Sequence, residues 1–179
     1  MTLLELFNTC NTGTGYNQTA KRVDWKIVDG IMFFRQSVER EDWIRNLLAA
    51  IPTVVWLKGF EIVPLGAWLT FLEVRKIAGA RVTGYVGYSQ GGWPAVYASR
   101  LYNRPAIVFG CPRATLCPCK YEDVTAYTNP GDVVTNLPPW AKEAGEVVML
   151  GGYAERPDDC PVLEWDSGHS PDEYRQRLV

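Results

Sequence analysis

Hydrophobic residues along this chain fall alternately into short continuous runs and into stripes with helical spacing. Two apolar runs, residues 25–28 and 31–34, flank Asp29-Gly30, a dipeptide typical of a two-residue hairpin turn. Residues 39–51 then place apolar side chains at helical spacing behind an acidic first turn, where negative charge suits the helix dipole. The pattern predicts an antiparallel hairpin followed by an amphipathic helix.

Strands and helices continue to alternate down to the C-terminus. A second helical stripe follows the strand-like TVVWL and ends near Gly79, and a predicted strand then runs into a glycine-rich turn and a further helix. Ser170, Pro171 and Glu173 have the spacing of a capping box at the start of a last helix. The other predicted strands are residues 106–110, 124–128 and 146–150. This alternation predicts an α/β protein with a mostly parallel central sheet flanked by helices and an antiparallel hairpin near the N-terminus.

Length and composition fit one soluble domain over residues 1–179, with residues 1–20 expected to be poorly ordered. Hydrophobic residues make up 47% and charged residues 21%, and the net charge of −2 gives no electrostatic basis for binding nucleic acid. No apolar run is long enough for a membrane segment, and no basic stretch precedes an apolar run as in a secretion signal. We therefore expect a protein that is cytoplasmic as made, and release by another route stays open.

The five cysteines are an odd number, which argues against a disulfide framework and favours a reducing compartment. Three of them cluster in CPRATLCPC, at Cys111, Cys117 and Cys119. A zinc site would need a fourth ligand and paired short spacings, so we expect free thiols and no metal.

The turn Gly87-Tyr88-Ser89-Gln90-Gly91 lies between a predicted strand and a predicted helix. This is the context of a nucleophile elbow, in which glycines two residues before and after the Ser relieve clashes in a very tight turn. The alternative is a glycine-rich turn that only packs closely. A Ser hydroxyl is inert unless a base, an orienting acid and an oxyanion site accompany it.

The sequence contains one histidine, His169, and places it on a loop before the last helix. An elbow enzyme needs its acid between the Ser and the His in sequence. Asp132 is favoured because it follows a strand and a Pro-Gly turn directly. The competing acids are Asp123, Asp158, Asp159 and Asp166.

Taken together, these stretches resemble class 3 lipases, the family of fungal triacylglycerol lipases and their bacterial and viral relatives. The resemblance runs from residue 25 to residue 174. FRQS resembles the family's Phe-Arg-Gly-Ser, GYSQGG takes the place of Gly-His-Ser-Leu-Gly-Gly, and GHSPDEY resembles the catalytic His with its downstream Tyr. The further matching stretches are LKGF, FGCPR, TNPGDVVTNLPP and AGEVVML.

The resemblance implies an α/β-hydrolase fold and a serine hydrolase that cleaves ester or lipid substrates without a metal or cofactor. By position, Ser89 is then the nucleophile, His169 the general base and acid, and Asp132 the residue that holds the imidazole tautomer. The implied oxyanion donors are the backbone N–H groups of Ser37 and Gln90, with the Ser37 hydroxyl as a third.

Three departures from the family pattern leave alternatives open. Gln36 replaces a glycine before the oxyanion residue, and Tyr88 replaces a His, so that GYSQG also resembles the cutinase turn. The chain is also short for the family. Residues 38–51 correspond to the lid of the fungal lipases, although an apolar helix face of this kind can equally belong to the core. The alternatives are therefore a phospholipase, a cutinase-like esterase and a catalytically weak binding module of the same fold.

Overall fold

The computed structural model describes residues 1–12, 14–19, 23–35, 51–79, 82–151 and 168–179. Within these ranges the helices are α1 (Leu3–Asn11), α3 (Leu65–Ala78), α4 (Gly92–Tyr102) and α5 (Pro171–Arg177). Three short 3₁₀ turns are η1 (Ser89–Gly91), η2 (Pro118–Lys120) and η3 (Val134–Asn136). The strands are β1 (Asn17–Gln18), β2 (Asp24–Val28), β3 (Ile31–Arg35), β4 (Pro52–Trp56), β5 (Phe60–Pro64), β6 (Gly84–Tyr88), β7 (Ala106–Phe109), β8 (Val124–Thr128) and β9 (Glu146–Met149).

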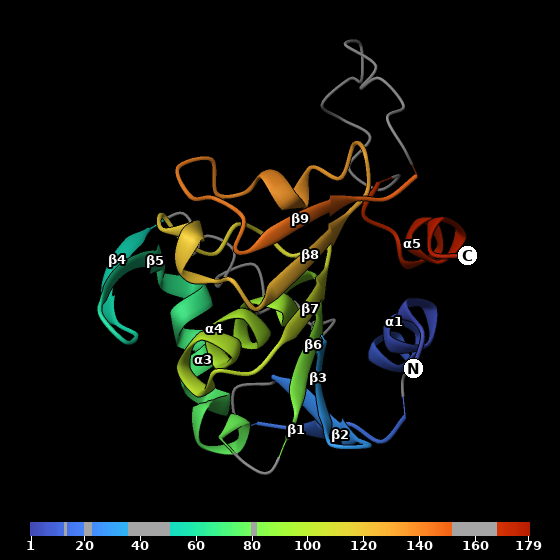
Figure 1. Cartoon of the computed structure of the whole chain (residues 1–179), viewed down its shortest axis with the longest axis horizontal. Helices are drawn as coiled ribbons and strands as arrows, with labels where there is room; N and C mark the ends of the chain where they lie inside the picture. Colours follow the sequence, from blue (N-terminus) through green and yellow to red (C-terminus); the bar gives the residue numbers. More distant parts are fainter. Residues whose placement is uncertain (13, 20–22, 36–50, 80–81, 152–167) are drawn as a thin grey trace.

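Seven of these strands form one twisted sheet in the order β1-β2-β3-β6-β7-β8-β9 (Figure 1). The first three strands pair antiparallel, whereas β3, β6, β7, β8 and β9 are parallel. The β2–β3 turn places Asp29 and Gly30 at φ values of 50° and 78°, as a two-residue hairpin of this type requires. The mostly parallel sheet and the early antiparallel hairpin are both confirmed.

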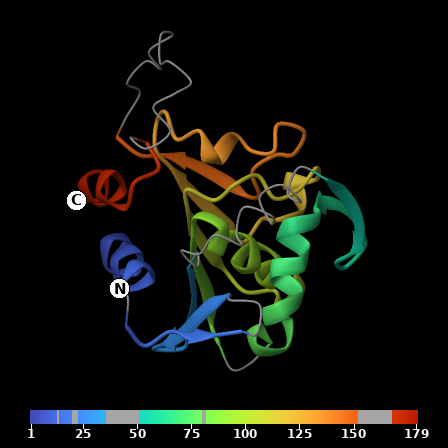
Figure 2. The same cartoon turned by 180° about the vertical axis from the view of Figure 1, so that it is seen from behind.

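Helices cover both faces of this sheet. The α3 and α4 pair packs on one face and α1 and α5 lie on the other, next to each other, so that the two chain ends are neighbours (Figures 1 and 2). Every residue of β6 is buried, which is expected for a central parallel strand covered on both faces. The carboxyl ends of the parallel strands therefore meet at one edge of a well-packed sheet, where ligands of such folds bind.

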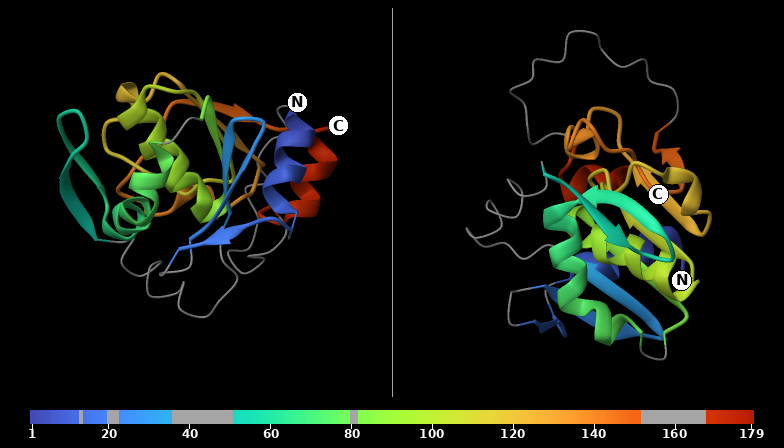
Figure 3. Two further views of the ribbon diagram at one scale, coloured as in Figure 1. Left: turned by 90° about the horizontal axis from the view of Figure 1, so that it is seen from below. Right: turned by 90° about the vertical axis from the view of Figure 1, so that its left-hand side faces the viewer.

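A second, two-stranded sheet lies apart from the first. It consists of β4 and β5, which pair antiparallel from Pro52↔Pro64 to Trp56↔Phe60. This hairpin projects from the α3 layer, away from α1 and α5 (Figure 3). Its turn contains the Leu57-Lys58-Gly59 part of the LKGF stretch, with Lys58 at φ 54° and Gly59 at φ 133°.

Most predicted elements are present at nearly the predicted positions, including the second helix, the strand before Ser89 and the last helix. Ser170 caps α5 by accepting a hydrogen bond from the backbone N–H of Glu173 at 3.2 Å. The segment 1–20, for which we expected little order, contains α1, whose Phe7 and Cys10 are buried. Neither α1 nor β5 was predicted. The helix expected at residues 39–51 lies outside the described residues except for Ile51.

Candidate active site

Ser89 occupies a tight turn between β6 and the helical run of η1 and α4. Its φ of 54° lies in the left-handed region, which a non-glycine residue adopts only where the surrounding structure enforces it. A methyl group on Gly87 would overlap the carbonyl of Gly91, and one on Gly91 would lie 2.5 Å from the carbonyl oxygen of Phe34. Both glycines are therefore needed for the turn to fit, and strand, turn and helix form the predicted elbow.

Asp132 lies on the loop that follows β8, on the same edge of the sheet as Ser89. Its carboxylate is fully buried and accepts three hydrogen bonds. Oδ1 accepts from the backbone N–H of Val134 at 2.9 Å, and Oδ2 accepts from the Tyr174 hydroxyl at 2.8 Å and from Nδ1 of His169 at 2.8 Å. These bonds keep a buried carboxylate satisfied and fix its orientation.

His169 precedes α5 and contacts both of the other predicted residues. Its Nδ1 is 2.8 Å from Oδ2 of Asp132, and its Nε2 is 2.8 Å from Oγ of Ser89. A carboxylate only accepts hydrogen bonds, so the arrangement assigns the proton to Nδ1 and leaves Nε2 as the acceptor for the Ser hydroxyl. The structure thus brings together Ser89, Asp132 and His169, which are far apart in sequence.

The other acids considered do not share this position. Asp123 directly precedes β8, and its carbonyl accepts from the N–H of Ala106, which places it at the opposite end of the parallel strands from Asp132. Asp158, Asp159 and Asp166 lie outside the described residues.

Two tyrosines hold the His–Asp pair from the α1 and α5 face. Burial is the main cause, and the nearby Asp132 the second, that raises the pKa of Tyr174 far above its ordinary value. The Tyr174 hydroxyl therefore stays protonated and donates to Asp132. Tyr88 donates its hydroxyl to the backbone carbonyl of His169, and its ring stacks on the imidazole at 5.4 Å between centroids and 15° between planes. Burial likewise raises the pKa of Tyr88.

The sequence identified Tyr88 only as a departure from the family pattern and gave no sign of this contact. Tyr88 is the last residue of β6, and its ring contacts Phe7 of α1 and Tyr174 of α5, so it points to the face that carries these helices, where His169 also lies. A further bond not predicted joins Nδ2 of Asn129 to the carbonyl of Gly168 at 3.0 Å. The backbone on both sides of the Gly168–His169 bond is therefore held by side chains from β6 and from the loop after β8.

Of the two predicted oxyanion residues, Gln90 lies within the described residues and Ser37 does not. Gln90 follows Ser89 directly in η1, at the beginning of the helical run that leads into α4. Ser37 and Gln36 lie outside the described residues, as does the proposed lid except for Ile51. The last described residue of β3 is Arg35, and the register Phe34↔Gly87 places that end of β3 beside the Ser89 turn. The roles of Ser37 and Gln90 remain predictions.

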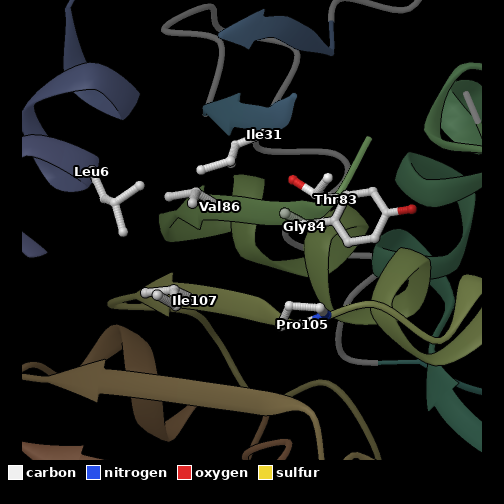
Figure 4. Close-up of a pocket in the computed structure, with 8 residues that line it drawn as sticks. Leu6, Ile31, Thr83, Gly84, Val86, Pro105 and Ile107 are labelled. Carbon is white, nitrogen blue, oxygen red and sulfur yellow. The ribbon is translucent and has the colours of Figure 1, made fainter. Parts of the chain in front are cut away.

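A pocket of about 160 Å³ lies on the α1 face, and its lining includes Leu6, Ile31, Val86, Pro105 and Ile107 (Figure 4). It also reaches Gly84 at the beginning of β6, the end opposite Ser89, and none of the three predicted catalytic residues lines it. This pocket is therefore separate from the Ser–His–Asp cluster.

Cys111, Cys117 and Cys119 are free thiols, as is Cys10. Within the described ranges, no three His, Cys, Asp or Glu side chains are grouped so as to hold a metal ion. Burial raises the pKa of the Cys10 thiol to about 12 and that of Cys111 well above its ordinary value, so both thiols stay protonated at neutral pH. No described helix is long and apolar enough to cross a membrane.

Solved structures of fungal lipases have a similar fold. A triacylglycerol lipase whose catalytic centre is described as a serine protease triad matches with a TM-score of 0.63 and 19% identity over 76% of this chain and 65% of that one. The triacylglyceride lipase of Rhizomucor miehei matches with a TM-score of 0.61, 20% identity and the same coverage. Lip2 lipase from Yarrowia lipolytica matches with a TM-score of 0.56 and 12% identity over 72% and 61%.

No protein-family model matches the sequence, and no curated protein matches it either. The chain spans 65% and 54% of the length of two further fungal lipase structures that it resembles, a lipase–inhibitor complex and a propeptide complex of the R. miehei lipase. At these identities the likeness establishes the fold. The chain has the α/β-hydrolase fold of the fungal lipases, as the resemblance in sequence implied.

Proposed function

We propose that this protein is a serine hydrolase that cleaves carboxylic esters through an acyl-enzyme. The observation that carries the proposal is the continuous hydrogen-bonded chain from Ser89 Oγ to His169 Nε2 and from His169 Nδ1 to Asp132, with both distances at 2.8 Å. A nucleophile, a base and an orienting acid in this geometry are what acyl transfer requires. The fungal lipases of similar fold make an ester the favoured substrate class.

In the proposed reaction, the Ser89 oxygen attacks the ester carbonyl carbon while His169 Nε2 accepts the hydroxyl proton. The tetrahedral intermediate collapses, the C–O bond to the alcohol breaks, and His169 returns the proton to the leaving alkoxide. Water then repeats the sequence on the acyl-enzyme, which releases the acid and restores Ser89. The Asp132 carboxylate stabilises the imidazolium that forms at each transfer.

The negative oxygen of the intermediate needs hydrogen-bond donors. We assign this role to the backbone N–H of Gln90 and to Ser37, as the resemblance implies. Helical N–H groups that follow the nucleophile point toward developing negative charge. Each such donor lowers the activation barrier by about 2.7–4 kcal/mol in enzymes of this kind.

The test is hydrolysis of a series of p-nitrophenyl esters of increasing acyl length. Replacement of Ser89 by Ala is expected to lower kcat by about a million-fold, because the covalent route is lost. Ser99 is as buried as Ser89 and lies on α4, so Ser99→Ala is the matched control and should keep its activity. Equal activity of purified Ser89→Ala and wild-type protein would contradict the proposal.

A cutinase-like esterase or a phospholipase would use the same residues on a different acyl bond. The Tyr88-Ser89-Gln90 sequence, which resembles the cutinase turn, favours the first of these. Phospholipid and amide substrates assayed beside the ester series separate them. A folded protein that hydrolyses none of these substrates would instead fit a binding module of the same fold.

A further inference from the structure

The β4–β5 hairpin presents one wholly apolar face to solvent. Side chains alternate along a strand, and the register pairs Val54 with Ile62 and Trp56 with Phe60 on the outer face. Their exposed fractions are 65%, 37%, 67% and 73%, and the Trp56 and Phe60 rings meet edge to face at 5.0 Å. We call these four residues the outer face of the hairpin. Large exposed apolar side chains that lie next to one another commonly mark interaction sites.

The opposite face of the hairpin holds it against the domain. Val55 and Val63 are buried in the core with α3 and α4. Glu61 is also buried, and its carboxylate pairs with Arg100 at 3.3 Å and accepts the Tyr121 hydroxyl at 2.6 Å. The hairpin is therefore anchored without any contribution from its outer face. Among the described residues, packing does not explain the apolar character of that face.

The edge of β5 is already in use. The carbonyl of Ile62 accepts the backbone N–H of Leu116 at 3.0 Å, and the carbonyl of Phe60 accepts the Lys120 ammonium at 3.1 Å. A second copy of the chain that added a strand at this edge would need those carbonyls free. The β5 edge is therefore occupied, whereas the outer face of the hairpin is exposed.

Positive charge borders the outer face. Residues 51–64 contain two charged side chains, Lys58 and Glu61. Glu61 is buried and paired with Arg100, whereas Lys58 is exposed in the turn between Trp56 and Phe60, where its ammonium donates to the neutral side chain of Asn103 at 2.9 Å, a contact that does not compensate its charge. Lys120 adds a second cation beside Phe60. Aromatic rings backed by lysines are typical of surfaces that insert at the boundary of an anionic lipid layer.

We propose that the outer face of the β4–β5 hairpin docks onto an anionic lipid–water interface, with Trp56 and Phe60 inserted and Lys58 at the headgroups. The binding does not require the chemistry at Ser89. Its effect on turnover rests on the proposed function: docking concentrates the enzyme at aggregated esters and leaves the hydrolysis of soluble esters unchanged.

Binding is measured by co-sedimentation of Ser89→Ala protein with vesicles of phosphatidylcholine alone or mixed with phosphatidylglycerol. This variant removes hydrolysis from the assay, so failure of the proposed reaction cannot imitate failure of binding. We expect binding to the mixed vesicles. Adding Trp56→Ser and Phe60→Ser should weaken it at least about tenfold, since two large apolar side chains lose their burial. Lys58→Glu should weaken binding to the mixed vesicles only.

The matched controls make the same kinds of substitution, apolar to Ser and Lys to Glu, at exposed positions outside the hairpin. Val147→Ser with Met149→Ser removes two exposed apolar residues from β9, and Lys76→Glu reverses a charge in the last turn of α3. Both should bind as the parent does. Circular dichroism and thermal unfolding verify that each variant is folded.

Three results would overturn the proposal. They are absence of vesicle binding by the folded parent, equal losses in the hairpin and control variants, and a concentration-dependent dimer in light scattering that Trp56→Ser with Phe60→Ser abolishes. The last result would assign the outer face to a second copy. In the active background, the hairpin variant should lose turnover on emulsified ester and retain it on soluble p-nitrophenyl butyrate.

Discussion

The two ends of this molecule use aromatic side chains in opposite ways. On the α1 and α5 face, Tyr88 and Tyr174 are buried and donate hydrogen bonds to His169 and Asp132. On the β4–β5 hairpin, Trp56 and Phe60 are largely exposed and contact mainly each other. The first pair holds the His–Asp pair in place, whereas the second forms the exposed surface that we propose docks onto a lipid interface.

The exposed residues of the outer face contribute little to the stability of the fold, whereas the buried Tyr88 and Tyr174 are needed to hold the site in place. Phe7 of α1 packs against Tyr88 at 5.5 Å and stacks on Tyr174 at 5.7 Å between ring centroids. The N-terminal helix thus supports both tyrosines that hold the His–Asp pair. We therefore expect substitutions in the site to change activity steeply and substitutions on the outer face to leave stability nearly unchanged.

Among the side chains that hold His169 in place, Asp132 is expected to have the largest effect. In Asp132→Asn the amide keeps the shape of the carboxyl group but presents an NH₂ that stabilises the wrong imidazole tautomer. We expect kcat to fall by about 10⁴-fold. Steady-state kinetics on p-nitrophenyl butyrate measure this loss. A fall of less than tenfold in folded protein would show that Asp132 does not orient His169.

A smaller effect is expected from the hydroxyl of Tyr88. Tyr88→Phe removes the bond to the His169 carbonyl and keeps the stacked ring, so stability should fall by about 1 kcal/mol and kcat by several-fold with KM unchanged. Tyr97→Phe is the matched control, because Tyr97 is buried and donates to the Ala114 carbonyl at 2.7 Å away from the site. It should lose similar stability and no activity. Equal losses of kcat in both variants would assign Tyr88 a purely structural role.

The smallest effect is expected on the outer face of the hairpin. Val54 is 65% exposed and Val63 is fully buried, on paired strands of one hairpin. Val54→Thr should change the free energy of unfolding by less than about 0.5 kcal/mol, whereas Val63→Thr buries a hydroxyl and should cost about 1–3 kcal/mol. Urea unfolding of both variants makes the comparison. A large loss in Val54→Thr would mean that the outer face belongs to the core.

The sequence predicted those parts of the fold that depend on local patterns. The Asp29-Gly30 turn, the apolar strand before Ser89 and the cap at Ser170 each have a local physical cause, and each is present. The helix α1 was missed because its burial depends on contacts with β3 and β6 that no short window contains. The strand β5 was missed because its alternation of exposed and buried residues places an acid, Glu61, at a buried position, and Glu61 finds its partner Arg100 only in the folded chain.

For the site too, the sequence predicted the residues that local pattern and order identify, and missed a contact that depends on the tertiary fold. Ser89, Asp132 and His169 could be selected by residue type, order and position after strands, and the structure places them within hydrogen-bond distance. The stacking of Tyr88 on His169 could not be selected in this way. It requires the loop before α5 to return to the face of β6 opposite the nucleophile, which is a property of the tertiary fold.

The central claim, that Ser89 is activated by His169, is tested most directly by labelling with a fluorophosphonate and mapping the adduct by mass spectrometry. One adduct is expected, on Ser89, and it should form rapidly in wild-type protein and much more slowly in His169→Gln. Ser99, which is equally buried, should carry none. A folded wild-type protein that stays unlabelled, or that is labelled at Ser89 equally fast without His169, would contradict the account.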